Sequence, residues 1–280
     1  MKQIFGLAIA ALAVTSVAFA QTPAPREPAK APVIGQEGKD VIWWPTPDSL
    51  VQLMLKTAKV TDTDYVVDLG AGDGKIVIAA ARDFGARALG LEYNPDLVAF
   101  ARQNAERAGV SNKAKFAQAD IFKTDFSNAD VVTMYLLSTL NMKLRPTLLK
   151  MKPGTRIVSN SFDLGDWEPD ASFESEGYNG YFWVVPAEVK GRYAVALPGA
   201  SAPAEVKLSQ RFQKVDGTAR IGNARASVLN AKLVGADLSL TIVDAANKSW
   251  AVSAKVLGDR LVGTVAAQGG ASAAFAARRE

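Results

Sequence analysis

The feature that most limits the fold of this chain is a glycine-rich turn in the segment VVDLGAGDGK, residues 66–75. The apolar residues before the turn predict a buried strand, and the pattern after Lys75 predicts a helix. Gly70 and Gly72 allow the backbone to approach a ligand closely, and the turn directs amide groups at the helix N-terminus. A tight turn without a ligand is the alternative, but three glycines with two acids are more than a turn requires.

The spacing of the glycines argues against two common ligands. A dinucleotide-binding turn needs G-x-G-x-x-G, and Lys75 occupies the position of the third glycine. This disfavours a nucleotide-dependent oxidoreductase. A phosphate-binding P-loop needs G-x-x-x-x-G-K-[ST], which is also absent here. Asp68 and Asp73 would repel a pyrophosphate, so they favour a ligand that carries positive charge.

Two further acids stand at the ends of the next two predicted strands. Glu92 closes the strand that follows the glycine turn, where a carboxylate can accept hydrogen bonds from ribose hydroxyls. An acid at a strand end is often only a surface residue, but its distance from this turn favours a site. Asp120 ends the following strand, beside the apolar Ile121, where it is placed to contact an adenine amino group.

Short β-branched runs alternate with longer helical patterns from about residue 40 to residue 180. This alternation predicts an α/β fold, a doubly wound and mostly parallel Rossmann-like sheet. Thr46 is the expected N-cap of the first helix, with Pro47 at its first position. Strands are expected at 65–69, 88–93, 115–118, 131–135 and 155–159, and helices at 75–84, 95–108 and 140–151.

The last hundred residues, 181–280, have a different pattern. Apolar residues recur there with period two, and no helical stretch interrupts them. Asp216-Gly217, Gly235-Ala236 and Gly258-Asp259 are the expected turn pairs between strands. We therefore predict a C-terminal all-β domain, an antiparallel sandwich or barrel.

The N-terminus has the pattern of an export signal. Residues 1–20 combine Lys2 with an apolar run and the small-x-small ending Ala18-Phe19-Ala20, which predicts cleavage before Gln21 and a periplasmic or secreted protein. An uncleaved membrane anchor is the alternative. Residues 21–39 are rich in proline and alanine and predict an extended linker. After cleavage we expect no stable membrane span.

The composition excludes several kinds of chemistry. The chain has no histidine and no cysteine, so a Ser-His-Asp triad, a cysteine nucleophile and the usual zinc ligands are all unavailable. We predict no metal site. The net charge of +4 is spread along the chain rather than gathered in blocks, so we do not expect a nucleic-acid partner.

The segment DLGAGDG, with Glu92 and Asp120, resembles the class I S-adenosylmethionine-dependent methyltransferases. The segments PTP (45–47), DLGAGDGKIVIAAA and VVTMYLLSTLNMKLRPTLLKMKPGTRIVS resemble more closely the protein-lysine methyltransferases with mitochondrial inner-membrane members, and their bacterial relatives. The resemblance implies S-adenosyl-L-methionine as cofactor. It implies that the methionine end lies against Asp68, Gly70, Ala71, Gly72 and Gly74, the ribose against Glu92, and the adenine against Asp120 and Ile121.

The same resemblance implies that Tyr135, Leu136 and Leu137 line the methyl-transfer channel. The residues after the fourth strand, MYLLS, lack the Asn/Asp-Pro-Pro-aromatic motif of DNA and glutamine methyltransferases. An acceptor amine, in particular a protein lysine held neutral by apolar walls, fits what remains. Tyr135 and Asn141 are the candidate catalytic residues, although Tyr135 can also fill the core and Asn141 can also cap a helix. The alternative function is an exported, noncatalytic binding protein that uses the old cofactor pocket and the β domain.

Overall fold

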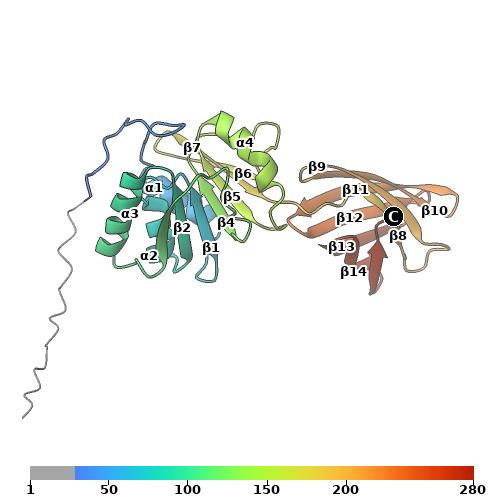
Figure 1. The fold of residues 1–280 in the computed structure, drawn as a ribbon. Helices are drawn as coiled ribbons and strands as arrows, with labels where there is room; N and C mark the ends of the chain where they lie inside the picture. Colours follow the sequence, from blue (N-terminus) through green and yellow to red (C-terminus); the bar gives the residue numbers. More distant parts are fainter. Residues whose placement is uncertain (1–28) are drawn as a thin grey trace, which may run out of the picture.

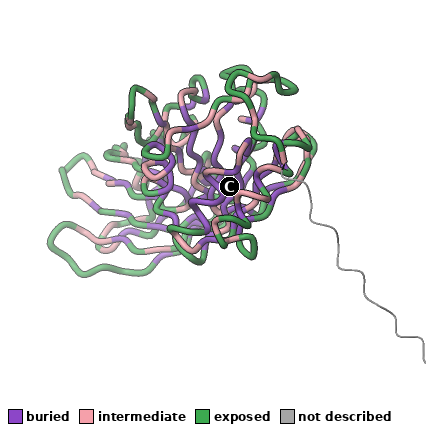
Figure 2. The backbone as a smooth tube through the Cα atoms, turned by 90° about the vertical axis from the view of Figure 1, so that its left-hand side faces the viewer, coloured by how far each residue is buried: buried purple, intermediate pink, exposed green. Residues whose placement is uncertain are grey.

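The computed structural model describes residues 29–280 as two β-sheets that follow one another along the chain (Figure 1). The first sheet carries all the helices of the described part, and the second has none. Buried residues run through the strands of both sheets, while exposed residues concentrate at turns and outer loops (Figure 2). Two hydrophobic cores cover the two faces of the first sheet, and a third fills the second sheet.

The first sheet has the strand order β3-β2-β1-β4-β5-β7-β6. Its first five strands are parallel, and β7 and β6 are antiparallel to their neighbours. The strands are β1 (Tyr65–Leu69), β2 (Arg87–Glu92), β3 (Ala114–Gln118), β4 (Val131–Met134), β5 (Arg156–Asn160), β6 (Ala171–Ser175) and β7 (Tyr178–Val184). The predicted Rossmann-like sheet is therefore confirmed.

Helices cover both faces of this sheet. The helices are α1 (Asp48–Thr57), α2 (Lys75–Asp83), α3 (Pro95–Arg107) and α4 (Ser138–Leu148). The apolar faces of α1, α2 and α3 share one core, whereas α4 packs into the core on the opposite face. The first helix begins later than predicted: Pro47 is its N-cap, and Thr46 is buried and accepts a hydrogen bond from Asn160.

The second sheet contains eight antiparallel strands in the order in which they occur in the chain. They are β8 (Gly191–Val195), β9 (Ala204–Arg211), β10 (Lys214–Ile221), β11 (Ala224–Val234), β12 (Asp237–Asp244), β13 (Ser249–Leu257), β14 (Arg260–Ala267) and β15 (Ser272–Arg278). A bridge between Tyr193 and Arg279 brings the two edges together. The predicted all-β domain is thus a nearly closed barrel, with Trp250 and Tyr193 buried inside it.

Two of the three predicted turn pairs are confirmed. Gly235-Ala236 and Gly258-Asp259 join β11 to β12 and β13 to β14. The prediction for Asp216-Gly217 is wrong, because Gly217 lies inside β10 and pairs with Leu208. A Cβ atom on Gly217 would lie 2.8 Å from Leu208 Cδ2, so the glycine leaves room for the Leu208 side chain of β9. The turn lies instead at Phe212-Gln213, with Phe212 at a φ of +52°.

The first sheet ends with β7 at Val184, and the second sheet begins with β8 at Gly191. The predicted signal peptide and the first part of the linker lie outside the described residues, and export stays a prediction. Residues 33–43, which include the end of the linker predicted at 21–39, fold instead into a small hairpin with a bridge between Glu37 and Ile42. Within residues 29–280, no helix combines the length and apolarity that a membrane crossing requires.

Candidate functional site

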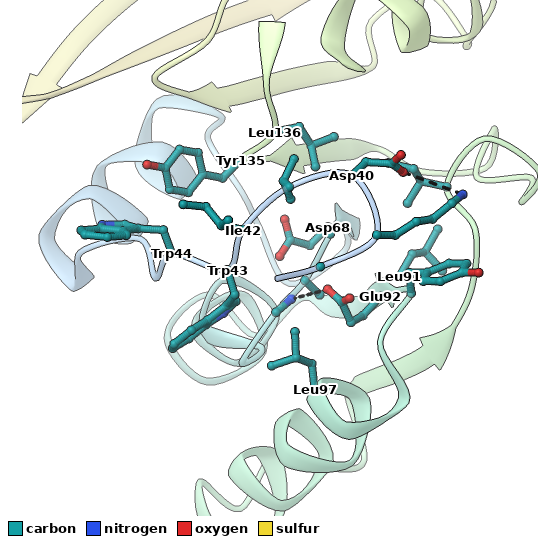
Figure 3. A pocket seen from close by; sticks show the side chains of 18 of the residues that line it. Asp40, Ile42, Trp43, Trp44, Asp68, Leu91, Glu92, Leu97, Tyr135 and Leu136 are labelled. Carbon is teal, nitrogen blue, oxygen red and sulfur yellow. Dashed lines mark hydrogen bonds and ion pairs between the residues drawn. The ribbon is translucent and has the colours of Figure 1, made fainter. Parts of the chain in front are cut away.

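A cavity of about 650 Å³ opens at the carboxyl ends of β1, β2 and β4. Parallel strands bring the residues that follow them to one edge of a sheet, which is where open α/β sheets bind ligands. The cavity is lined from four directions: the glycine turn, the segments after β2 and β3, the segment after β4, and the hairpin before α1 (Figure 3).

The glycine turn forms the floor of the cavity. Gly70, Gly72 and Gly74 all have positive φ angles, of +80°, +53° and +85°. The amides of Gly70 and Ala71 donate to the carbonyl oxygen of Leu91, which fixes the turn against β2. Gly70, Ala71 and Gly72 line the cavity, but Gly74 is not among its lining residues. A Cβ atom on Gly74 would lie 2.6 Å from Phe116, so this glycine allows α2 to pack on the sheet.

Asp68 lies at the centre of the cavity (Figure 3) and is only 3% exposed. Thr133 of the neighbouring strand donates a hydrogen bond of 2.7 Å to its carboxylate. Burial raises the pKa of Asp68 to about 7, the bond from Thr133 opposes the rise, and the nearby charges of Glu92 and Asp73 add to it. A cation placed beside such a buried carboxyl stabilises its charged form.

Glu92 connects the end of β2 to the glycine turn. One carboxylate oxygen accepts from the Gly72 amide at 2.9 Å, and the other accepts from the Asn94 amide at 2.9 Å. Each carboxylate oxygen has a second lone pair. Glu92 therefore holds the turn in place and still has acceptor capacity that faces the cavity.

Asp120 and Ile121 line the far end of the cavity, next to the exposed ring of Tyr93. The Asp120 carboxylate accepts from the Phe122 amide and from Lys39 Nζ, each at 3.0 Å. The hydrogen bond from Lys39 is the main reason that the pKa of Asp120 lies below its ordinary value. Lys39 Nζ also lies 4.7 Å from the centre of the Tyr93 ring.

The hairpin of residues 33–43 forms a roof over the cavity, and it was not among the elements predicted from the sequence. Backbone bonds from Gly35 to Trp43, from Trp43 to Gln36 and from Gly38 to Val41 hold it together. Its residues 37–43 line the cavity. Gly35 and Gly38 between apolar residues were the available signal, but the proline-rich composition of the preceding residues concealed it.

Aromatic and apolar side chains line the opposite end of the cavity, after β4. Tyr135 stacks on Phe162 with ring centres 6.4 Å apart, and Leu136 and Trp44 line the same region. Burial raises the pKa of Tyr135, while a hydrogen bond with Ser161 opposes the rise. The Tyr135 hydroxyl therefore stays protonated at neutral pH and can both donate and accept.

Asn141, the other candidate catalytic residue, is fully buried and is not among the lining residues of the cavity. Its amide nitrogen donates to Ser159 Oγ and to the carbonyl oxygens of Phe162 and Asp163. The structure thus places Asn141 behind the loop that carries Phe162. Asp68, the turn residues 70–72, Glu92, Asp120, Ile121 and Tyr135 meet in the cavity, whereas Gly74 and Asn141 support it from outside.

This fold and this site define a class I S-adenosylmethionine-dependent methyltransferase, and comparisons with known proteins agree. The profile of the ANTKMT methyltransferase domain family matches residues 68–171. A protein-lysine N-methyltransferase from Saccharolobus islandicus is 44% identical over 137 residues, which is 48% of this chain and 85% of that protein. The adenine nucleotide translocase lysine N-methyltransferase of Mus musculus is 38% identical over 107 residues, 38% of this chain and 47% of the mouse enzyme.

A solved structure is similar as well. The RNA methyltransferase from Salinibacter ruber in complex with S-adenosyl-L-homocysteine is 50% identical, with a TM-score of 0.51. The match covers 52% of this chain and 96% of that one. The chain belongs to the S-adenosylmethionine-dependent methyltransferase family that includes the S. islandicus protein-lysine N-methyltransferase. It is an enzyme that uses S-adenosylmethionine, and the alternative of a noncatalytic binding protein finds no support.

The cavity fits this cofactor. Asp68, Glu92 and Asp120 offer carboxylates to a ligand that bears a sulfonium, an ammonium, ribose hydroxyls and an adenine amino group. The volume lies in the range of small-molecule sites. A Cβ atom on Gly70 would lie 3.1 Å from Leu136, so the absence of a side chain at Gly70 keeps this part of the cradle open.

If Asp68 contacts the cofactor, we expect cofactor binding to depend on pH. Below about pH 7 the carboxyl of the free protein is protonated, so we expect the affinity for S-adenosylmethionine to fall by up to about tenfold per pH unit. Stability of the free protein should change in the opposite direction. The folded state keeps a proton that the unfolded chain has released, so the free energy of unfolding falls as pH rises from about 4 to about 7.

Calorimetric titration and urea unfolding over this range measure both slopes. The control is Asp68→Asn, which should remove most of both pH dependences. Equal slopes in the wild type and in Asp68→Asn would show that another group titrates.

Proposed function

We propose that this enzyme transfers the methyl group of S-adenosylmethionine to the side-chain amine of a protein lysine. The observation that carries the proposal is the aromatic and apolar end of the cofactor cavity, formed by Trp44, Tyr135, Leu136 and Phe162. Such walls disfavour an ammonium ion and favour the neutral amine, whose lone pair is needed for the reaction. The lysine-specific relatives in Saccharolobus islandicus and Mus musculus support the same acceptor.

The residues of the cavity divide the work between them. The glycine turn and Asp68 hold the methionine end, Glu92 accepts hydrogen bonds from the ribose hydroxyls, and Asp120 with Ile121 binds the adenine. S-Adenosylmethionine bound there would supply an electrophilic methyl group on a positively charged sulfur, with a neutral thioether as the leaving group for attack by an amine nitrogen. Catalysis then depends mainly on alignment, because no general base is needed to activate the methyl group.

Tyr135 is placed to orient the incoming amine. Its neutral hydroxyl oxygen can accept a hydrogen bond from an amine N–H. That bond directs the lone pair of the amine nitrogen away from the tyrosine oxygen. The ring of Phe162, which stacks on Tyr135, and the indole of Trp44 also line the cavity that the amine would enter. After transfer, the proton of the methylated amine passes to solvent through the mouth of the cavity, where Ile42, Trp44 and Leu137 are partly exposed.

The charges of the cavity favour a lysine acceptor over RNA. RNA is the substrate class named for the Salinibacter ruber enzyme. Six of the lining residues are acidic: Glu37, Asp40, Asp68, Asp73, Glu92 and Asp120. The two lining lysines, Lys39 and Lys75, are both ion-paired, with Asp120 and Asp48. A phosphate backbone needs accessible cations, whereas a basic peptide segment gains from this acidic surrounding.

The experiment incubates the full chain with radiolabelled S-adenosylmethionine and, in parallel, with an array of lysine-containing peptides and with total RNA. We expect label in peptides, its loss when the peptide lysine is replaced by arginine, and methyl-lysine by mass spectrometry. Label in RNA alone would overturn the proposal, as would a protein that binds S-adenosylmethionine tightly but labels no lysine.

A further inference from the structure

The loop between β5 and β6, residues 161–170, carries Phe162 to the acceptor end of the cavity. Backbone amides donate to backbone carbonyls at both ends of the loop and once within it, from Trp167 to Leu164, and Ser161 at its start has a φ of +62°. Side chains of α4 hold it from one side: Asn141 bonds to the carbonyls of Phe162 and Asp163, and Arg145 bonds to that of Leu164 at 2.9 Å. These contacts secure the first half of the loop.

The second half of the loop is held by β7 and by the C-terminal barrel. From β7, Trp183 Nε1 donates to the carbonyl oxygen of Trp167 and the Val184 amide donates to the Asp170 carboxylate, each at 2.8 Å. The turn between β9 and β10, residues 211–214, reaches the methyltransferase domain and contacts it with four consecutive side chains. Phe212 stacks on Trp167 with ring centres 5.9 Å apart, and Arg211 pairs with Asp166 at 2.9 Å. Gln213 donates to the carbonyl oxygen of Glu168 at 2.6 Å, and Lys214 pairs with the Glu168 carboxylate at 3.2 Å.

The contacts from α4 and from the barrel meet at shared groups. Asp166 pairs with both Arg145 of α4 and Arg211 of the barrel. The Arg145 guanidinium also lies 5.6 Å from the Phe212 ring. Trp167 is fully buried between Trp183 of β7 and Phe212. Phe212 takes a left-handed backbone conformation that a non-glycine residue adopts at a cost, and such positions persist where the surroundings demand them.

We propose that the C-terminal barrel is a positioning element for methyl transfer, with Phe212 as its principal positioning residue. The barrel fixes Trp167 and Asp166, these fix the loop, and the loop places Phe162 against Tyr135 at the acceptor end. Cofactor binding, on the other side of the cavity, does not depend on these contacts. The inference rests on the proposed transfer to lysine, since it concerns the acceptor half of that site.

The test compares Phe212→Ala with Leu257→Ala, which truncates an exposed side chain at another turn of the same barrel. In Phe212→Ala we expect kcat/KM for the lysine peptide to fall by roughly tenfold or more, because a small displacement of a reacting group is costly. The affinity for S-adenosyl-L-homocysteine should stay within about twofold of the wild type. Phe212→Tyr, which keeps the ring, should restore kcat/KM, and Leu257→Ala should behave as wild type.

Hydrogen exchange gives a readout that does not need an acceptor. Residues 161–170 should exchange faster in Phe212→Ala, while β1 and β2 exchange as before. If Phe212→Ala does not fold, Arg211→Met tests the neighbouring contact between the barrel and Asp166 from an exposed position. Unchanged kcat/KM and unchanged exchange of this loop would overturn the inference, as would an equal loss of cofactor affinity. A wild-type enzyme that methylates no lysine would instead overturn the proposed function, whatever the variants do.

Discussion

Replacing Gly72 with arginine is expected to abolish cofactor binding and leave the chain folded. Gly72 has a φ of +53°, and a Cβ atom there would lie 2.7 Å from the indole nitrogen of Trp43. A side chain at this position would strain the turn and project between the floor and the roof of the cavity. We expect the affinity for S-adenosylmethionine, measured by isothermal titration, to fall by about 100-fold or more.

Gly109→Arg is the matched control for this variant. Gly109 also has a left-handed backbone, with a φ of +70°, but a Cβ atom there would meet nothing within 4 Å. The backbone strain and the added charge are similar in the two variants, but only the side chain at position 72 meets Trp43 and enters the cavity. Wild-type affinity in Gly72→Arg would mean that the cofactor does not lie against the turn. Equal losses in both variants would point to a general effect of arginine.

Removing the Glu92 carboxylate is expected to weaken cofactor binding nearly as much. Glu92→Ala removes the acceptor of the Gly72 and Asn94 amides and the acceptor that we propose for the ribose hydroxyls. Hydrogen bonds to a charged group contribute about 1.5–3 kcal/mol each, so two of them account for a loss of about 100-fold or more. Glu92→Gln keeps a neutral acceptor and should lose less.

Titration with S-adenosyl-L-homocysteine measures these affinities, and Glu106→Ala on the exposed side of α3 is the control. Circular dichroism spectra should be the same for all three variants. If Glu92→Ala bound the ligand as well as Glu106→Ala does, the ribose would have to lie elsewhere.

The sequence allowed the cradle of the site to be predicted because its signals are local. A strand, three glycines and a helix follow one another within residues 66–83, and Glu92 and Asp120 stand where the next two strands end. Parallel pairing brings these positions together without further information. Gly74 shows the limit of such reasoning, since its motif position suggests a ligand contact and its surroundings show packing against Phe116.

The parts that could not be predicted depend on contacts between distant residues. The hairpin around Lys39 folds over Asp120, which is 81 positions away, and nothing in its composition indicates that partner. The turn at Phe212 has no glycine, because its shape is supported by Trp167 of the other domain. Asn141 resembles a helix cap in the sequence, and only the fold reveals the loop carbonyls that it binds.

The hairpin of residues 33–43 also has a bearing on how homologues are compared. It forms one wall of the cavity beside Asp120, the proposed nucleoside end, yet it precedes the stretch, 68–171, that matches the family profile. A protein that lacked only this hairpin would keep the glycine turn, Glu92 and Asp120, but the Asp120 side of the cavity would be open to bulk water. A comparison limited to residues 68–171 therefore leaves out a part of the cavity wall that can influence cofactor affinity.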